Sequence, residues 1–243
     1  MSVSEKKIAV VLAGCGVFDG SEIHEATCTL LNIAAQGASY QCFAPNIRQP
    51  MVVNHYTKAA EPDESRNVLT EACLLYTSDA AEPDESRNVL TEAARIARGN
   101  IKSLAEFNPD QFDAVIFPGG QGAAKNLCDF AVKGAACDVN PDVEQALVIA
   151  YEKQMPIGAI CIAPALVARV LGRHGITVTI GNDPKTAAEI EKTGARHQNC
   201  EVENICTDHA HKIVTTPAYM LAHSIAEVNE GIRKLVAEVL KLS

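Results

Sequence analysis

A cysteine between an apolar run and a helical pattern is the strongest candidate for chemistry in this sequence. Cys161 follows Pro-Ile-Gly-Ala-Ile and precedes Ile-Ala-Pro-Ala-Leu, which predicts a strand turning abruptly into a helix. A thiol at a helix N-terminus meets free backbone N–H groups and the positive end of the helix dipole, so its thiolate is favoured. Those N–H groups can also stabilise an oxyanion. We therefore treat Cys161 as a candidate nucleophile, and burial as a small apolar side chain is the alternative.

A glycine pair follows another apolar run. Gly119 and Gly120 come directly after the predicted strand 113–117 and Pro118. Paired glycines let the backbone approach a ligand closely and expose its N–H groups. The segment has neither the Walker lysine-serine pair nor a Gly-x-Gly-x-x-Gly pattern, so nucleotide binding is weakly supported. By itself the pair is consistent with a tight turn between a strand and a helix.

Two carboxylates stand at the start of the first predicted helix. Glu22 and Glu25 lie three positions apart, which is close to one helical turn, so both could face the same side. Acidic residues in a first helical turn often serve only to cap the helix or to interact with its dipole. Next to a thiolate, however, a carboxylic acid can move protons during carbonyl chemistry.

Apolar runs and helical patterns alternate along the chain, which predicts a mostly parallel sheet sandwiched between helices in one α/β domain spanning residues 1–243. In such sheets ligands bind beyond the carboxyl ends of the strands. Loops 14–22, 118–126 and 161–164 are expected at that edge. We predict helices at 21–36, capped by Ser21 and ended by Gly37, and at 143–153, 163–171 and 219–240, and strands at 7–13, 40–44, 113–117, 156–160, 176–180, 202–205 and 212–215.

One segment of the chain is duplicated. Residues 59–72 recur letter for letter as residues 80–93, displaced by 21 residues. Because the second copy continues its apolar stripe to Gly99, we expect that copy to pack on the core and residues 59–79 to form an exposed excursion. The other interpretation is a cloning or assembly error, since residues 73–79 resemble a translated sequencing adaptor. Without the extra 21 of the 243 residues the chain would have 222.

Composition excludes several classes of protein. The net charge is −9, no basic stripe is present, and no apolar run approaches the ~20 residues of a membrane helix. We therefore expect neither nucleic-acid nor membrane partners. The nine cysteines are scattered, without a Cys-x-x-Cys pair, so a disulfide framework and a zinc site both fit poorly. A reducing compartment, most simply the cytoplasm, fits them better, with mitochondria as the alternative in a eukaryote.

Four motifs together resemble the ThiJ/PfpI (class I glutamine amidotransferase-like) superfamily, and more closely its ElbB-type branch. They are Gly-Cys-Gly-Val-Phe-Asp-Gly-Ser-Glu-Ile-His-Glu-Ala from Gly14, Pro-Gly-Gly-x-Gly-Ala-x-Lys-Asn-Leu from Pro118, Cys-Ile-Ala-Pro-Ala from Cys161 and Thr-Thr-Pro-Ala-Tyr-Met from Thr215. The resemblance implies a flavodoxin-like domain, commonly dimeric, with an elbow cysteine at Cys161 and an acidic partner from the first helix, here Glu22 or Glu25. Several members have a histidine after the cysteine, whereas this chain has Ile162, so a Cys-His dyad is absent.

The resemblance implies a weak glyoxalase that needs neither glutathione nor any other cofactor or metal. Such an enzyme converts a small 2-oxoaldehyde, for example methylglyoxal or glyoxal, to a 2-hydroxy acid. Cys161 would add to the aldehyde carbon, Glu22 or Glu25 would move protons between the two carbonyl carbons, and the N–H groups of Gly119, Gly120 and Ile162 would hold the oxyanion.

Two alternatives remain open at this point. The first is a redox-sensing or regulatory protein that uses Cys161 without turnover. The second is an amidotransferase-like hydrolase, which would need a histidine such as His209 or His211 near the thiol. A metal site at those two histidines is less favoured, because no third ligand accompanies them.

Overall fold

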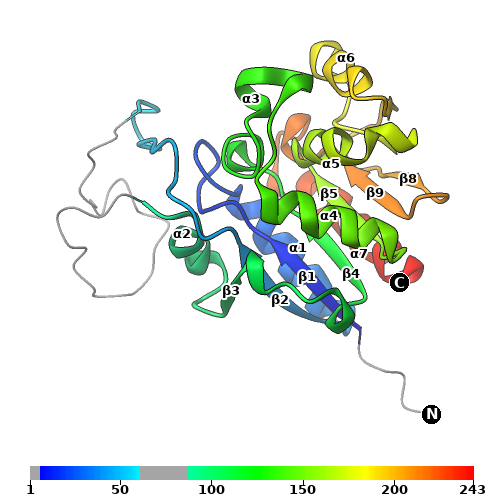
Figure 1. The fold of residues 1–243 in the computed structure, drawn as a ribbon, viewed down its shortest axis with the longest axis horizontal. Helices are drawn as coiled ribbons and strands as arrows, with labels where there is room; N and C mark the ends of the chain where they lie inside the picture. Colours follow the sequence, from blue (N-terminus) through cyan, green and yellow to red (C-terminus); the bar gives the residue numbers. More distant parts are fainter. Residues whose placement is uncertain (1–5, 61–86) are drawn as a thin grey trace.

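Seven strands form one sheet in the computed structural model of this chain, which describes residues 6–60 and 87–243 (Figure 1). The strand order is β3-β2-β1-β4-β5-β9-β8, and every neighbouring pair is parallel except β8 with β9. This arrangement confirms the expected α/β fold. The strands are β1 (Lys7–Val11), β2 (Ser39–Ala44), β3 (Ile101–Ser103), β4 (Ala114–Phe117), β5 (Ile157–Ile160), β8 (Cys206–Asp208) and β9 (Ile213–Thr216), and β6 (Thr177–Val178) pairs with β7 (Arg196–His197) in a separate ribbon.

Helices cover both faces of the sheet, as buried parallel strands require. In Figure 1, α4 and α5 lie in front of the sheet and α1 and α7 lie behind it. The central strands β4 and β5 are buried at every position, because both of their faces are covered. The α-helices are α1 (Ile23–Ala35), α2 (Val89–Ile96), α3 (Phe130–Lys133), α4 (Pro141–Glu152), α5 (Ala163–Leu171), α6 (Pro184–Lys192) and α7 (Ile225–Leu242), and the 3-10 helices are η1 (Leu104–Glu106), η2 (Pro109–Gln111), η3 (Gln121–Ala124), η4 (Gly134–Ala136), η5 (Gly172–His174) and η6 (Ala218–Met220).

The second copy of the repeated segment supplies helix α2. Asn88 caps this helix by accepting hydrogen bonds from the N–H groups of Leu90 and Thr91. Val89 and Ala93 are fully buried, so this copy packs on the core. Most of the first copy, and with it the expected excursion at 59–79, lies outside the described residues.

Several boundaries differ from the expectations. Ser21 is not the cap of α1: its hydroxyl accepts the N–H of Ala13, and Glu22 caps the helix instead. Helix α7 begins at Ile225 rather than near residue 219, because Ser224 and Glu227 form a capping box. The strand expected at 202–205 lies at β8 instead. Strands β3 and β7 and helix α6 were not anticipated.

The carboxyl ends of β1, β4, β5 and β9 point to one edge of the sheet, since these strands are parallel neighbours. The loops that follow these strands carry the candidate catalytic residues. Among the described residues, no helix combines the length and the hydropathy needed to cross a lipid bilayer.

Candidate active site

The candidate nucleophile lies at a strained corner between β5 and α5. Cys161 has a φ of +61°, in the left-handed region that side chains other than glycine rarely adopt. Its N–H donates to the carbonyl of Thr216 at the end of β9, at 2.9 Å. The residue is 8% exposed. Cys161 therefore lies at a sharp turn from strand to helix, and its side chain lies largely below the surface.

A carboxyl group from the first helix meets this thiol. Glu25 is fully buried and is hydrogen-bonded to the Cys161 side chain. Its Oε2 accepts the N–H of Gly119 at 3.1 Å, and its Oε1 accepts the N–H of Tyr219 at 3.2 Å. Loops that follow three different strands thus hold one carboxyl group against the sulfur.

The close approach of these two groups depends on the absence of a side chain at position 119. A Cβ at Gly119 would lie 2.4 Å from the Cβ of Cys161 and 2.5 Å from Oε2 of Glu25. It would also lie 2.8 Å from the carbonyl oxygen of Ile160, which cannot move without disturbing β5. Gly119 is therefore needed for space, whereas its neighbour Gly120 is also needed for its φ of +95°.

Burial raises the affinity of both the thiol and the carboxyl group for a proton. Burial is the main cause that raises the pKa of Glu25 to about 8, followed by the negative charge of Glu22. Burial and the charge of Glu25 raise the pKa of the Cys161 thiol well above its usual range. We expected a thiolate in the resting protein, and this expectation is wrong, because the burial of the sulfur beside a carboxylate outweighs the helix N-terminus.

Two backbone donors are directed at the sulfur. The N–H groups of Gly120 and Ile162 interact with the Cys161 side chain and partly offset the rise in its pKa. These two donors were expected in the oxyanion site. The N–H of Gly119, expected there as well, instead donates to Glu25. The available donors beside the sulfur are therefore Gly120 and Ile162.

Glu22 and Glu25 have different positions, which the sequence left unresolved. Glu22 caps helix α1: its Oε2 accepts the N–H of Glu25 at 2.7 Å. It is 8% exposed, and burial raises its pKa. Oε1 of Glu22 lies 4.0 Å from Nδ1 of His24. Glu25 is the carboxyl group that contacts the thiol, and Glu22 positions it through the backbone.

The segment after β9 was not assigned a role from the sequence. Ala218 has a φ of +44°, and this turn directs the N–H of Tyr219 at Glu25. The hydroxyl of Tyr219 and Nδ1 of His24 lie 2.7 Å apart at the outer side of the site. The motif Thr-Thr-Pro-Ala-Tyr-Met marked this segment, but a backbone donor cannot be recognised from residue type.

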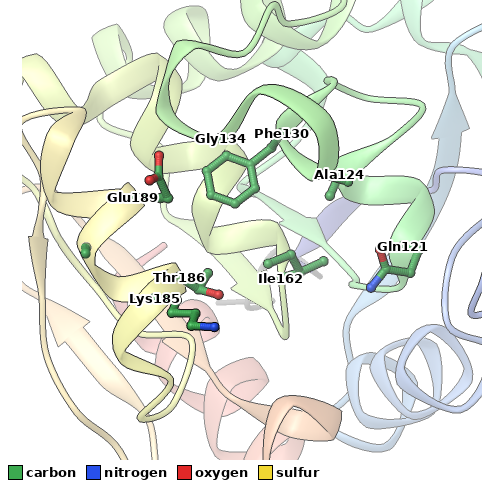
Figure 2. A pocket seen from close by; sticks show the side chains of 10 residues that line it. Gln121, Ala124, Phe130, Gly134, Ile162, Lys185, Thr186 and Glu189 are labelled. Atoms are coloured by element: carbon green, nitrogen blue, oxygen red, sulfur yellow. The ribbon is translucent and has the colours of Figure 1, made fainter.

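An open groove of about 670 Å³ lies beside the elbow. Ile162, the residue after Cys161, lines it together with Phe130 of α3 and Lys185 of α6. In Figure 2, Phe130 and Ile162 face the cavity, and Lys185 and Thr186 approach from the α6 side. The remaining lining residues are Gln121, Ala124, Ala131, Gly134, Ala188 and Glu189.

The histidines required by an amidotransferase lie at the wrong end of the sheet. His209 and His211 occupy the turn between β8 and β9, at the amino end of β9, whereas Cys161 contacts its carboxyl end. Nδ1 of His211 lies 2.9 Å from the carboxylate of Asp208. Within residues 6–60 and 87–243, no group of three or more His, Cys, Asp or Glu side chains could hold a metal ion.

This chain is similar to known proteins both in sequence and in structure. No family model matches the sequence. It is 43% identical to the human "Glutamine amidotransferase-like class 1 domain-containing protein 3, mitochondrial", over 98% of this chain and 83% of the relative. Its structure is similar to that of an isoprenoid biosynthesis protein with an amidotransferase-like domain from Ehrlichia chaffeensis, with 32% identity, a TM-score of 0.82 and coverage of 97% and 99% of the two chains. Glyoxalase III from Candida albicans shares the fold, with 15% identity, a TM-score of 0.57 and coverage of 98% and 97%.

Proposed function

We propose, on the premise that this chain belongs to the ThiJ/PfpI (class I glutamine amidotransferase-like) superfamily, that it converts 2-oxoaldehydes to 2-hydroxy acids without a cofactor. The observation that carries this proposal is the direct contact between the Cys161 thiol and the buried Glu25 carboxyl group. A buried acid with a pKa of about 8 is suited to accept and return a proton near neutral pH. We assign the chain to the ElbB-type branch on its four motifs.

The first step is addition of the thiol to the aldehyde. Ionised Glu25 takes the proton of Cys161 while the sulfur bonds to the aldehyde carbon, which activates a thiol that would otherwise stay neutral. The negative charge that develops on the aldehyde oxygen is stabilised by the N–H groups of Gly120 and Ile162. Return of a proton to this oxygen gives a hemithioacetal.

The second step is a proton transfer between adjacent carbons. Glu25 removes the proton from the former aldehyde carbon and a proton is delivered to the neighbouring carbon, which leaves a thioester on Cys161 and a new hydroxyl group. Water then cleaves the thioester and regenerates the thiol. The net reaction is addition of one water molecule to the 2-oxoaldehyde, so neither an oxidant nor a reductant is required.

We place the substituent of the substrate in the groove beside Ile162, which adjoins Cys161 in the chain but is lined by neither Cys161 nor Glu25. Its volume of about 670 Å³ exceeds what a three-carbon aldehyde fills, and its lining includes Phe130 and the cation of Lys185. These features favour 2-oxoaldehydes with an apolar substituent over methylglyoxal itself. Phenylglyoxal is a suitable probe of this preference.

Turnover by matched variants tests the proposal. We expect lactate formation from methylglyoxal to be lost in Cys161→Ala and to fall about 10²–10⁴-fold in Glu25→Gln, the range typical of a lost acid or base. Glu22→Gln is the control, since an amide oxygen can still cap helix α1 and the variant should keep most of the activity. Full lactate production by Cys161→Ala would exclude the mechanism.

Redox sensing is the second candidate function. The donors that surround the sulfur, Gly120 N–H, Ile162 N–H and protonated Glu25, would also hold the oxygens of a sulfinic acid at Cys161. Mass spectrometry after peroxide titration separates the two functions. Selective Cys161 sulfinic acid together with negligible turnover would favour sensing.

The proposal also covers the cellular compartment and the oligomeric state of this chain. The human relative is named as mitochondrial, and a reducing mitochondrial or cytoplasmic compartment suits a chain that depends on a free thiol. We propose that the chain forms a homodimer and binds a small carbonyl compound. We propose that it binds neither nucleic acid nor a membrane. Light scattering on the purified protein measures the oligomeric state.

A further inference from the structure

A second pair of thiols lies apart from Cys161 and takes no part in the proposed mechanism. The thiols of Cys128 and Cys137 lie close enough to change each other's pKa, and Sγ of Cys128 donates to the carbonyl of Ala123 at 3.4 Å. The two residues are 5% and 0% exposed. Two neighbouring buried thiols can form a disulfide once the backbone between them adjusts.

The backbone around these cysteines explains their contact. Cys128 pairs with Val139 in an antiparallel bridge, and the N–H of Asn140 donates to the carbonyl of Leu127 at 2.9 Å. Alternate residues of an extended strand face the same side, so Cys137, two positions before Val139, is the diagonal neighbour of Cys128. Diagonal pairs lie about 7–8 Å apart, just beyond the Cα separation that a disulfide spans, so residues 134–137 must move toward Cys128 for the bond to form.

The surroundings divide the pair into a nucleophile and its partner. The neighbouring Cys128 and the charge of Arg169 lower the pKa of the Cys137 thiol. The neighbouring Cys137, together with burial, raises the pKa of Cys128. Nε of Arg169 donates to the carbonyl of Cys137 at 2.7 Å, which holds the cation near this residue. The position of Arg169 beside Cys137 favours this residue as the thiol that reacts first.

We propose that Cys128 and Cys137 form a reversible disulfide when the protein meets hydrogen peroxide. The Cys137 thiolate attacks one peroxide oxygen, breaks the O–O bond and becomes a sulfenic acid, while the other oxygen leaves as water after protonation. The Cys128 sulfur then displaces the sulfenic oxygen as a second water molecule and forms the S–S bond. Two thiols are oxidised and one peroxide is reduced to two waters. A dithiol reductant reverses the step by thiol–disulfide exchange.

The disulfide would act on the groove beside the active site. Residues 129–136, between the two cysteines, form α3 and η4, and Phe130 and Gly134 from this segment line the groove (Figure 2). The N–H of Ala135 donates to Glu189 on the opposite wall, at 2.9 Å. A shift of η4 toward Cys128 would therefore move residues on both walls of the groove.

The chain offers a direct test by peptide mapping. Trypsin cleaves after Lys125, Lys133 and Lys153, which places the two cysteines in the separate peptides 126–133 and 134–153. Cys161→Ser protein is treated with hydrogen peroxide, alkylated, digested without reductant and analysed by mass spectrometry. We expect the two peptides to be joined, with two hydrogens fewer than their sum, and to separate on treatment with dithiothreitol.

Thermal unfolding provides a second measurement on the same samples. A cross-link that closes a loop of about ten residues should raise the Tm by up to roughly 5–10 °C. Adding Cys137→Ser should abolish both the joined peptides and the Tm shift, whereas Cys42→Ser, at a buried cysteine in β2, should preserve both. Recovery of Cys128 and Cys137 only as free thiols or sulfinic acids would overturn the proposal. None of these measurements depends on turnover, so the proposed glyoxalase activity can fail while this site stands.

Discussion

Replacement of Glu25 by glutamine should remove a pH dependence of stability that the wild-type protein carries. The folded protein raises the pKa of Glu25 from 4.5 to about 8, so it binds this proton more tightly than the unfolded chain does. The stabilisation linked to the protonated carboxyl group is therefore fully present below about pH 4.5 and is lost as the pH rises through 8.

The size of the effect follows from the shift. Each pKa unit corresponds to about 1.4 kcal/mol, so a change from 4.5 to about 8 corresponds to up to about 5 kcal/mol. Most of this, about 3.5 kcal/mol, falls between pH 5 and pH 8. An amide at position 25 does not titrate. It also places an NH₂ group against the N–H of Gly119 or of Tyr219, which lowers stability by an amount that does not vary with pH.

Urea unfolding of both proteins at pH 5, 6, 7 and 8 measures the effect. The free energy of unfolding of the wild type should fall relative to that of Glu25→Gln as the pH rises. Glu152→Gln, at an exposed position at the end of α4, should follow the wild type throughout. A difference between wild type and Glu25→Gln that stays constant within about 0.5 kcal/mol over this range would refute the assigned environment of Glu25.

Gly119, the ionisation of Glu25 and the cap of helix α7 can each be tested separately. Gly119→Ala should lower the free energy of unfolding by about 1–3 kcal/mol, because its methyl group collides with Cys161 and Glu25; urea unfolding measures this, and an unchanged midpoint would contradict it. The kcat/KM for methylglyoxal should rise with pH and level off above about 8, as Glu25 ionises to its basic form; a profile that falls between pH 6 and 8 would argue against Glu25 as the base. Ser224→Ala should destabilise the protein by about 0.5–2 kcal/mol through loss of the cap of α7, with kcat unaffected; a stability equal to that of the wild type would show that the capping box is dispensable.

Sequence patterns predicted the central elements well, because burial on both faces leaves a clear signal. The apolar runs at 113–117 and 156–160 became β4 and β5, and the helix expected at 163–171 has those bounds as α5. The peripheral elements gave weaker signals. Strand β3 is only three residues long, and β7 is only two. Helix α6 had an Asp-Pro start at Asp183, which was not interpreted as a cap.

The site could be predicted as far as residue types carry the chemistry. Cys161 and Glu25 were both named, because a thiol at a strand–helix junction and an acid at a helix start are visible in the sequence. The choice between Glu22 and Glu25 was not visible, since it depends on which side chain turns inward and which caps the helix. The charge state of Cys161 could not be predicted from the sequence either, because it is set by burial and by a carboxylate 136 positions away in the chain.

The anchoring of Glu25 has a consequence for how the protein opens. Its carboxyl group joins α1 to the ends of β4 and β9, through amides that are 94 and 194 positions distant in sequence. Fraying of any one loop cannot free this group, because the other contacts remain. We therefore expect the carboxyl group of Glu25 to stay in place when one of these loops opens, and the Gly119 and Tyr219 amides to exchange slowly with deuterium because both donate to a buried acceptor.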